Sequence, residues 1–186
     1  NLALLGAKTV LLYKLPSNHT DDHVEAMCAK LKTEGANVLV YPYQKSTTSA
    51  STAQQIIANW VEAMQEDEGK NITAILTNYA ADSQYVINNV QGVTLSDGST
   101  LTAAETGAWI GGITAGAKIT ESNTARKFVG AIDVTPRMTK TETETAIKAG
   151  KLILTVDKSQ NVTVVADVNS LTSTTQTLGD IMKQNR

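Results

Sequence analysis

The clustered side chains of metal-ligand type in this sequence are His19, Asp21, Asp22 and His23. Two histidines four residues apart can share one helix face and bind zinc, as in H-E-x-x-H sites. Here His19 precedes the residues that could cap the helix, and the glutamate of that motif is missing. Acidic residues are favoured near a helix N-terminus by the helix dipole. We therefore interpret the cluster as a solvated first turn and predict no metal site, although an ion near Asp21 and Asp22 stays open.

Nucleophilic catalysis needs a Ser, Cys or Thr beside a positioned base. The two histidines share one short stretch, and the serines form no G-x-S-x-G elbow. The single cysteine, Cys28, excludes an internal disulfide and a cysteine-based zinc site, and it falls on an apolar helix face as a buried thiol would. Glu142 and Glu144 are two residues apart and point to different sides of a helix. We predict no catalytic residues.

A glycine-rich segment at 107–117 is the remaining candidate. Gly107 and Gly111, and then Gly112 and Gly116, repeat at a spacing of four. No Lys-Ser/Thr follows at the offset of a P-loop, and the first expected strand is followed by Lys-Leu-Pro-Ser instead of a phosphate-binding G-x-G-x-x-G, so no cofactor is predicted. Each glycine inside a helix costs about 1 kcal/mol against alanine. Close backbone packing is the interpretation we favour, with a ligand on the glycine face as the alternative.

The elements that would position these residues alternate between strand and helix. Short apolar runs at 9–13, 37–41 and 72–77 predict strands. The helix between the first two begins at Thr20 or Asp21, with Asp22 and Glu25 resembling a capping box, and ends at Gly35. Its apolar face carries Val24, Met27, Cys28 and Leu31, and the next helix carries Ile56, Ile57, Trp60, Val61 and Met64. This order predicts an α/β fold with a parallel core sheet built from β-α-β-α-β and right-handed crossovers.

The rest of the chain adds a β-hairpin and packing helices to this core. A strand is expected at 85–90, a hairpin at 93–101 and a helix at 102–117 that begins with a Thr102–Glu105 capping box. An irregular stretch at 118–137 follows. A helix at 139–149, a hairpin of 151–156 with 162–168, and a short helix within 171–185 complete the chain. We predict a single domain over 1–186, with possible sub-parts 1–101 and 102–186.

The composition excludes several classes of function. Sixteen basic and eighteen acidic residues give a net charge of −2, which does not fit a basic nucleic-acid-binding face. No apolar run is long enough for a membrane span, and no signal peptide is visible.

An enzymatic or small-ligand-binding α/β domain would use the loops after the parallel strands, at Ser17, Gln44 or Asn78. An adhesin-like module is a third, weaker alternative because secretion signals and disulfides are absent. A chain without an acid, base, nucleophile or cofactor loop is more typical of a structural protein.

Several motifs resemble those of contractile tail sheath proteins of myophages, phage-like elements and R-type bacteriocins. The segment 109–117 is similar to the family's A-W-(V/I)-A-G-x-x-A-G-A stretch, and 131–139 (AIDVTPRMT) to its A-V-D-V-x-P-R-x-T. Further likenesses are Trp60-Val61 with 66–70 (EDEGK), the turn at Asp97-Gly98, 148–152 (KAGKL) and 167–172 (DVNSLT). The chain departs from the family at Asn123-Thr124-Ala125, where an L-T-Y is usual, so contacts of that tyrosine are not carried over.

The resemblance implies a sheath subunit that polymerises around a tail tube and contracts to drive the tube through a cell envelope. It implies no catalysis, no cofactor and no metal. The expected partners are other sheath subunits, the tube protein and the baseplate, with no nucleic acid and no membrane insertion. Family subunits are joined by terminal arms that add strands to a neighbour's sheet, and we expect both arms to lie outside this sequence, leaving the isolated chain monomeric. Assembly would occur in the bacterial cytoplasm, followed by incorporation into a virion or phage-tail-like particle.

Overall fold

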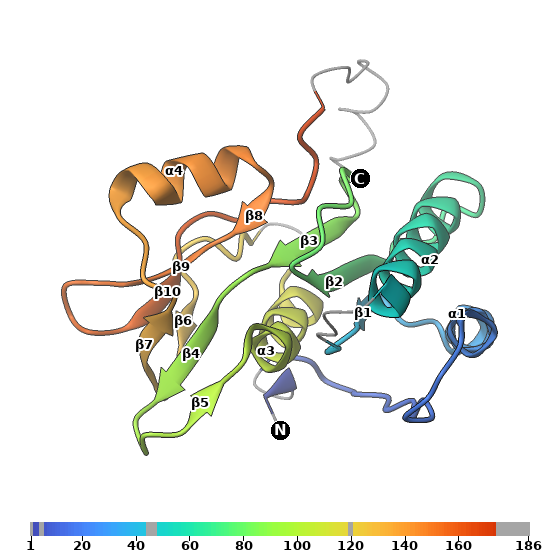
Figure 1. Cartoon of the computed structure of the whole chain (residues 1–186), viewed down its shortest axis with the longest axis horizontal. Helices are drawn as coiled ribbons and strands as arrows, with labels where there is room; N and C mark the ends of the chain where they lie inside the picture. Colours follow the sequence, from blue (N-terminus) through green and yellow to red (C-terminus); the bar gives the residue numbers. More distant parts are fainter. Residues whose placement is uncertain (1, 4–5, 44–47, 119–120, 174–186) are drawn as a thin grey trace.

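The computed structural model of the chain describes residues 2–3, 6–43, 48–118 and 121–173. A parallel sheet with strand order β1-β2-β3-β8 lies at its centre (Figure 1). Smaller antiparallel sheets, ordered β6-β10-β9 and β5-β4-β7, lie on one side of it. The helices are α1 (Asp21–Glu34), α2 (Thr48–Glu66), α3 (Ala103–Gly116) and α4 (Lys140–Lys148). The strands are β1 (Val38–Val40), β2 (Thr73–Thr77), β3 (Val86–Asn89), β4 (Gly92–Leu95), β5 (Thr100–Leu101), β6 (Lys127–Phe128), β7 (Ala131–Thr135), β8 (Lys151–Leu152), β9 (Leu154–Val156) and β10 (Val162–Val164).

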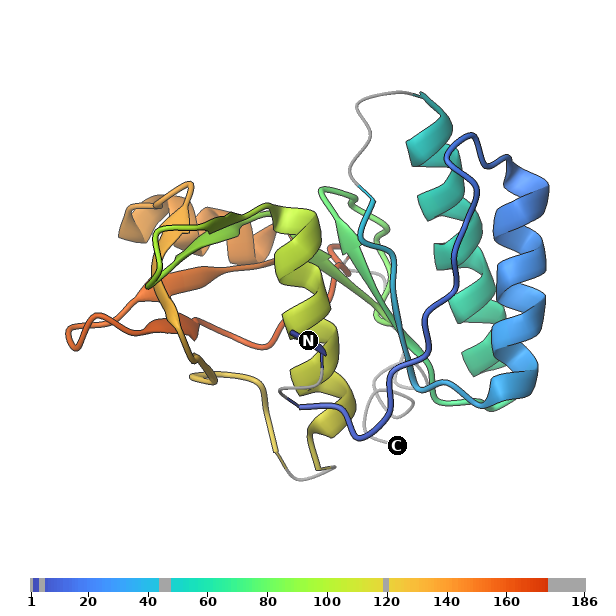
Figure 2. The ribbon, with the colours of Figure 1, turned by 90° about the horizontal axis from the view of Figure 1, so that it is seen from below.

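The parallel sheet is covered on both faces, which confirms the predicted α/β class. Leu39, Ala74 and Leu76 contribute to a core with α1 and α2, while Ile75 and Ile87 contribute to a second core with α3 and the smaller sheets. Successive side chains of a strand point to opposite faces, so a strand with apolar residues at every position serves both cores. Figure 2 shows α3 on one side of the sheet and the α1–α2 pair on the other.

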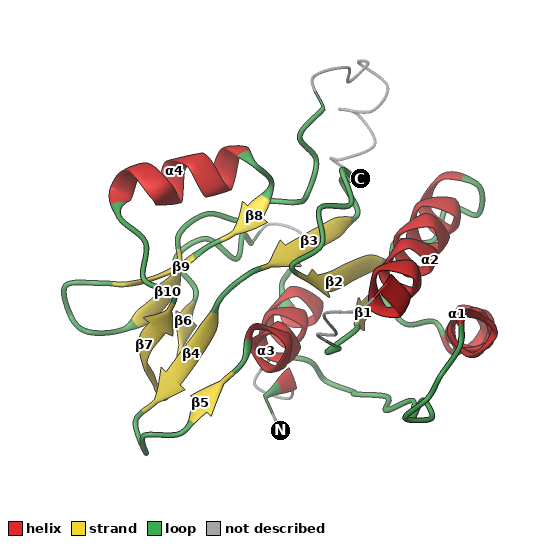
Figure 3. Cartoon of the chain, in the orientation of Figure 1, coloured by secondary structure: helices red, strands yellow, loops and turns green. Residues whose placement is uncertain are grey.

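The predicted strand at 9–13 is wrong. Figure 3 shows this segment as part of the loop that leads to α1. An apolar run without alternation is typical of a strand covered on both faces, but here Leu11 is 54% and Leu12 is 94% exposed. The parallel sheet instead recruits β3 and β8 from later in the chain, so its strands are β1, β2, β3 and β8.

The region 118–137, expected to be irregular, contains two strands. β6 pairs with β10, and β7 pairs with β4. The hairpin at 93–101 is confirmed by the antiparallel pair β4–β5. The hairpin at 151–156 and 162–168 is confirmed only in part, because β9 pairs with β10 whereas β8 joins the parallel sheet beside β3. Ile153, fully buried between β8 and β9, marks the point where the chain passes from one sheet to the other.

The helix boundaries follow local capping chemistry. In α3 the Thr102 amide donates to Glu105 Oε2 at 2.8 Å, which confirms the predicted capping box. The box predicted for Asp22 and Glu25 is wrong: α1 is capped by Thr20, whose amide donates to His23 Nδ1 at 3.2 Å. The helix at 139–149 is confirmed as α4. The helix expected within 171–185 lies largely outside the described residues.

Candidate functional site

The two histidines of metal-ligand type near α1 have structural partners. His19 Nε2 lies 2.8 Å from the Tyr41 hydroxyl, and its Nδ1 lies 3.1 Å from the carbonyl oxygen of Pro16. Burial, with the nearby Tyr43 second, raises the pKa of Tyr41 to about 12. Within the described residues, no three His, Cys, Asp or Glu side chains form a group that could hold a metal ion. The arrangement anchors the turn before α1 to the end of β1.

One of the loops proposed for a small ligand, the turn before α1, is joined by His19 to Tyr41 at the end of β1. The Asn78 amide donates to the Asn89 carbonyl oxygen at 2.9 Å, so this residue is tied to the end of β3. Ser17 lies in the exposed turn before α1, and Gln44 lies outside the described residues. A cavity of about 480 Å³ instead opens elsewhere, between α3 and the N-terminal residues.

The candidate catalytic groups also have structural roles. Cys28 is buried in the α1–α2 core, where burial, followed by the charge of Glu25, raises the pKa of its thiol to about 11. Glu142 accepts a hydrogen bond from the Thr139 amide at 2.8 Å and caps α4, whereas Glu144 pairs with Lys140 at 3.8 Å. These carboxylates therefore do not act on a common reacting atom.

The four glycines of α3 form two faces with different neighbours. A Cβ built on Gly107 would lie 3.6 Å from Ile75, and one on Gly111 would lie 2.2 Å from Val40 Cγ2, so this face packs on the parallel sheet. On the other face, a Cβ on Gly112 would meet the carbonyl oxygen of Ala3 at 2.3 Å. A Cβ on Gly116 would likewise lie 2.2 Å from the carbonyl oxygen of Gly6. Close packing is confirmed, and its second partner is the backbone of the N-terminal residues.

We call residues 2–3 and 6–13 the N-terminal strap. After Gly6 the strap leaves α3 and exposes Val10, Leu11, Leu12 and Tyr13. The cavity lies between the strap and α3. Its lining is mainly apolar, with one basic and one acidic residue, and consists of Leu2, Ala3, Lys8, Thr9, Val10, Leu12, Pro42, Glu105 and Ala108.

The other end of the described chain is held by a polar clamp, which we define as Asp82 and Ser83 with Ser170, Thr172 and Ser173. Asp82 accepts hydrogen bonds from the Thr172 amide at 2.7 Å and the Ser173 amide at 2.9 Å. The Ser170 hydroxyl donates to the Ser83 carbonyl oxygen at 2.9 Å and accepts from the Ser83 amide at 3.2 Å. The hydrogen bonds from Thr172 hold the pKa of Asp82 below its ordinary value, with those from Ser173 adding to the effect.

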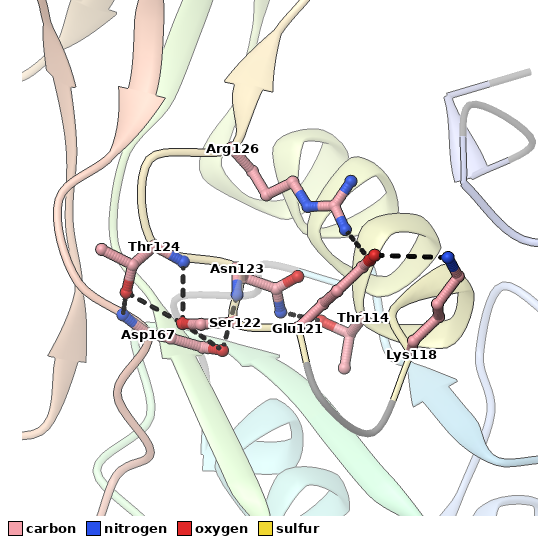
Figure 4. A network of polar contacts seen from close by, with 8 residues as sticks. All are labelled: Thr114, Lys118, Glu121, Ser122, Asn123, Thr124, Arg126 and Asp167. Carbon is pink, nitrogen blue, oxygen red and sulfur yellow. Dashed lines mark hydrogen bonds and ion pairs between the residues drawn. The ribbon is translucent and has the colours of Figure 1, made fainter.

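A second polar network fixes the approach to this clamp (Figure 4). Asp167 accepts from the Asn123 amide at 2.9 Å, and its own amide donates to Thr124 Oγ1 at 2.9 Å. Asn123 Nδ2 reaches back to Thr114 Oγ1 on α3 at 3.2 Å. Glu121 pairs with Arg126 at 2.6 Å on the same loop. The chain after β10 is therefore bound to α3 through the loop that precedes β6.

In this geometry, both ends of the described chain are held by contacts with the rest of the chain. Residues 18–170 match the family model described as the phage tail sheath protein central domain. The chain belongs to the phage tail sheath protein family. Sheath proteins of this family are structural, not enzymes.

Individual sheath relatives agree with the family match. The phage-like element PBSX protein XkdK of Bacillus subtilis is 29% identical over 163 residues, which cover 87% of this chain and 34% of that protein. The crystal structure of a sheath tail protein from Desulfitobacterium hafniense aligns with a TM-score of 0.79 at 30% identity, covering 95% of this chain and 44% of that one. The helical sheath of the anti-feeding prophage, in its contracted state, shares the fold with a TM-score of 0.63 at 15% identity, covering 98% of this chain and 54% of that one. This sheath domain therefore spans about a third of the length of the curated relative.

Three of the motifs that resemble those of sheath proteins lie in contacts within this sheath domain. The segment 109–117 forms most of α3, and 167–172 carries Asp167 and the Ser170–Thr172 part of the clamp. Within 131–139, Asp133 pairs with Arg137 at 2.7 Å at the end of β7. Sequence reasoning missed Asp82, Ser83 and the strap as functional elements. The only local signal for the clamp was the DVNSLT motif, because its partners lie about ninety residues earlier.

Proposed function

We propose that this sheath domain is the rigid central body of a subunit that polymerises around a tail tube and contracts to drive the tube through a target cell envelope. The observation that carries the proposal is that both ends of the described chain are anchored on one body. The strap is seated on Gly112 and Gly116 of α3, and the segment at 170–173 is held by Asp82 and Ser83. A force applied to either end would be transmitted to the parallel sheet without first unfolding a loop.

The packing of the two sub-parts supports movement of residues 1–186 as a single unit. α3, which lies after residue 101, contacts β1 and β2, and β8 pairs with β3. The stacked rings of Trp109 and Phe128, 4.3 Å apart at their centroids, join α3 to the sheet that contains β6. Protein interiors packed in this way are rigid and respond to strain by shifting as a whole.

The proposed partners are other sheath subunits, the tail tube protein and a baseplate. Assembly would take place in the cytoplasm of the producing bacterium, before incorporation into a virion or phage-tail-like particle. Within the described residues no helix is long and apolar enough to cross a membrane. We further propose that the isolated 186-residue chain is monomeric and that stable polymerisation needs additional contacts from a longer subunit.

The test is to produce the gene product that carries this sequence, with and without its tail tube protein, and to image it by electron microscopy. We expect tubular polymers, and we expect this domain to fit extended and contracted polymers as one rigid body. Sedimentation of the 186-residue chain alone is the matched control and should give a monomer. A gene product that stays monomeric at high concentration with tube present would overturn the sheath role. A strand rearrangement between the two polymer states would overturn the rigid-body part alone.

A further inference from the structure

The exposed large apolar side chains of the described residues fall into two patches. One is the strap, with Val10, Leu11, Leu12 and Tyr13, and the other is the corner of β6 and β7, with Val129 in the link and Ile132 in β7. In both Figure 1 and Figure 2, α3 lies between the strap that leads to α1 and the strands β6 and β7. The two patches therefore do not cover each other within one chain. Contiguous apolar surface of this kind marks interaction sites.

The strap patch lies beside a cavity. Its cavity of about 480 Å³ is of the size that holds buried ligand groups, and Leu2, Val10, Leu12 and Ala108 give it an apolar lining. Lys8 and Glu105 supply one charge of each sign. In the part of the chain that the structure describes, Lys8 forms no ion pair. The strap patch thus offers apolar walls beside two opposite charges.

The β6–β7 corner, residues 127–133, is a projecting turn. Val129 is 72% and Ile132 is 48% exposed, while Phe128 and Ala131 beside them are buried and fix the backbone of the corner. Gly130 has φ +90°, and a Cβ built on it would meet nothing within 4 Å, so this position of the turn faces open space. Lys127 precedes the apolar pair and forms no ion pair within the described residues, although its charge helps to lower the pKa of Asp157. Asp133 follows the apolar pair and is held by Arg137 at 2.7 Å.

We propose that the β6–β7 corner of one copy inserts Val129 and Ile132 into the cavity between the strap and α3 of the next copy. Apolar side chains then enter an apolar cavity, and Lys127 approaches the opposite charge of Glu105. The inference rests on the proposed function, because it requires neighbouring copies. A contact between two different surfaces is heterologous, and repeated along a chain of subunits it generates an open helical polymer or a ring. A strap facing a second strap would instead leave both cavities unfilled.

A single corner in a single cavity buries little area compared with stable interfaces, which need about 1,200 Å² or more. The contact would therefore hold copies together only when other contacts align them, in agreement with a monomeric isolated chain. It is consequently tested in the polymer of the gene product, where neighbours are already in place. Another segment of the gene product, or the tail tube protein, is the rival occupant of the cavity.

The test is disulfide cross-linking with the double variant Leu12→Cys plus Val129→Cys. A disulfide forms only where the two Cβ atoms approach to about 4 Å, and the natural Cys28 is buried and does not compete. We expect oxidation of the polymer to give a ladder of covalent oligomers. Either single variant should give no ladder, and the matched double variant Leu12→Cys plus Lys148→Cys, with Lys148 exposed on α4, should also give none.

The outcomes separate this inference from the sheath role. Polymers that form but give no ladder would overturn the inference and leave the sheath role intact. Cross-linking of the Leu12→Cys single variant, either with itself or with the tube protein, would have the same meaning. Absence of polymers would overturn both. As a second measurement, Val129→Asp should keep the thermal stability of the folded domain while raising the concentration needed for polymerisation, and Lys148→Asp should change neither. Equal polymerisation of both variants would contradict the proposal.

Discussion

Replacing Gly112 by alanine tests whether the N-terminal strap is docked on α3 by backbone contact. The new Cβ would lie 2.3 Å from the Ala3 carbonyl oxygen, against the 3.4 Å of ordinary contact, so the strap has to move by about 1 Å. Gly107→Ala is the matched control on the same helix. Its Cβ would have its nearest neighbour, Ile75 Cγ2, at 3.6 Å, which is ordinary contact.

The magnitudes follow from two opposing effects. Alanine in place of glycine favours a helix interior by about 1 kcal/mol, so Gly107→Ala should stabilise the domain by roughly that amount. In Gly112→Ala the same gain is offset by loss of strap packing. Leu2 packs partly buried against the α3 core, and complete burial of such a side chain is worth about 1.5–3 kcal/mol. Gly112→Ala should therefore be about 1–2 kcal/mol less stable than Gly107→Ala.

A third variant separates strap release from helix propensity. Gly6 lies outside α3, and a Cβ on it would meet the Gly112 carbonyl oxygen at 2.4 Å. Gly6→Ala should thus release the strap without the stabilisation that alanine gives to a helix interior. Urea unfolding measures the stabilities, and hydrogen exchange of strap amides and limited proteolysis measure release. If Gly112→Ala were as stable as Gly107→Ala with unchanged strap exchange, backbone docking of the strap on α3 would be refuted.

Three further predictions concern the clamp and the core. Asp82→Ala should lower the protection of the Thr172 amide from hydrogen exchange at neutral pH. Because the pKa of Asp82 is lowered in the folded protein, the wild-type clamp should weaken only as the pH falls through that lowered value. An equal protection factor above and below that value, after division by the intrinsic exchange rate at each pH, would contradict this. Gln91 is fully buried and bridges the Leu154 amide and the Pro136 carbonyl oxygen, both at 2.7 Å. Gln91→Ala leaves two backbone groups unpaired and should cost about 3 kcal/mol in urea unfolding, whereas a cost within experimental error would show that water replaces the side chain. The Cys28 thiol should react with a disulfide reagent at pH 8 only on unfolding, since burial raises its pKa to about 11, and rapid reaction of the folded domain would contradict its burial.

The elements predicted correctly from sequence depend on local patterns. The start of α3 follows from its Thr–x–x–Glu box, and the buried face of α1 follows from apolar spacing. The glycine pairs of α3 predicted close packing for the same reason, because an unfavourable residue inside a helix requires compensation. These signals act within a few residues and need no knowledge of the remaining chain.

The elements that sequence reasoning missed depend on distant partners. The residues of β8 were expected to form a strand within 151–156, but their partner, the edge of β3, was missed because it lies about sixty residues earlier. The clamp joins Asp82 to Thr172 across ninety residues, so neither residue alone indicates a function. Thr20 was one of the two caps expected for α1, but its partner His23 was missed because histidine is an unusual partner in a capping box.

The failed strand at 9–13 has a physical reason that bears on assembly. An apolar run indicates that side chains are to be buried, but it does not specify which surface buries them. Within one chain Leu12 stays 94% exposed, although exposing so large an apolar side chain gains nothing for the isolated domain. In a subunit built for a polymer, the same run can be buried by a neighbouring copy. The strap therefore carries a burial signal that a single chain does not satisfy, and the cavity beside it is where we expect a neighbour to satisfy it.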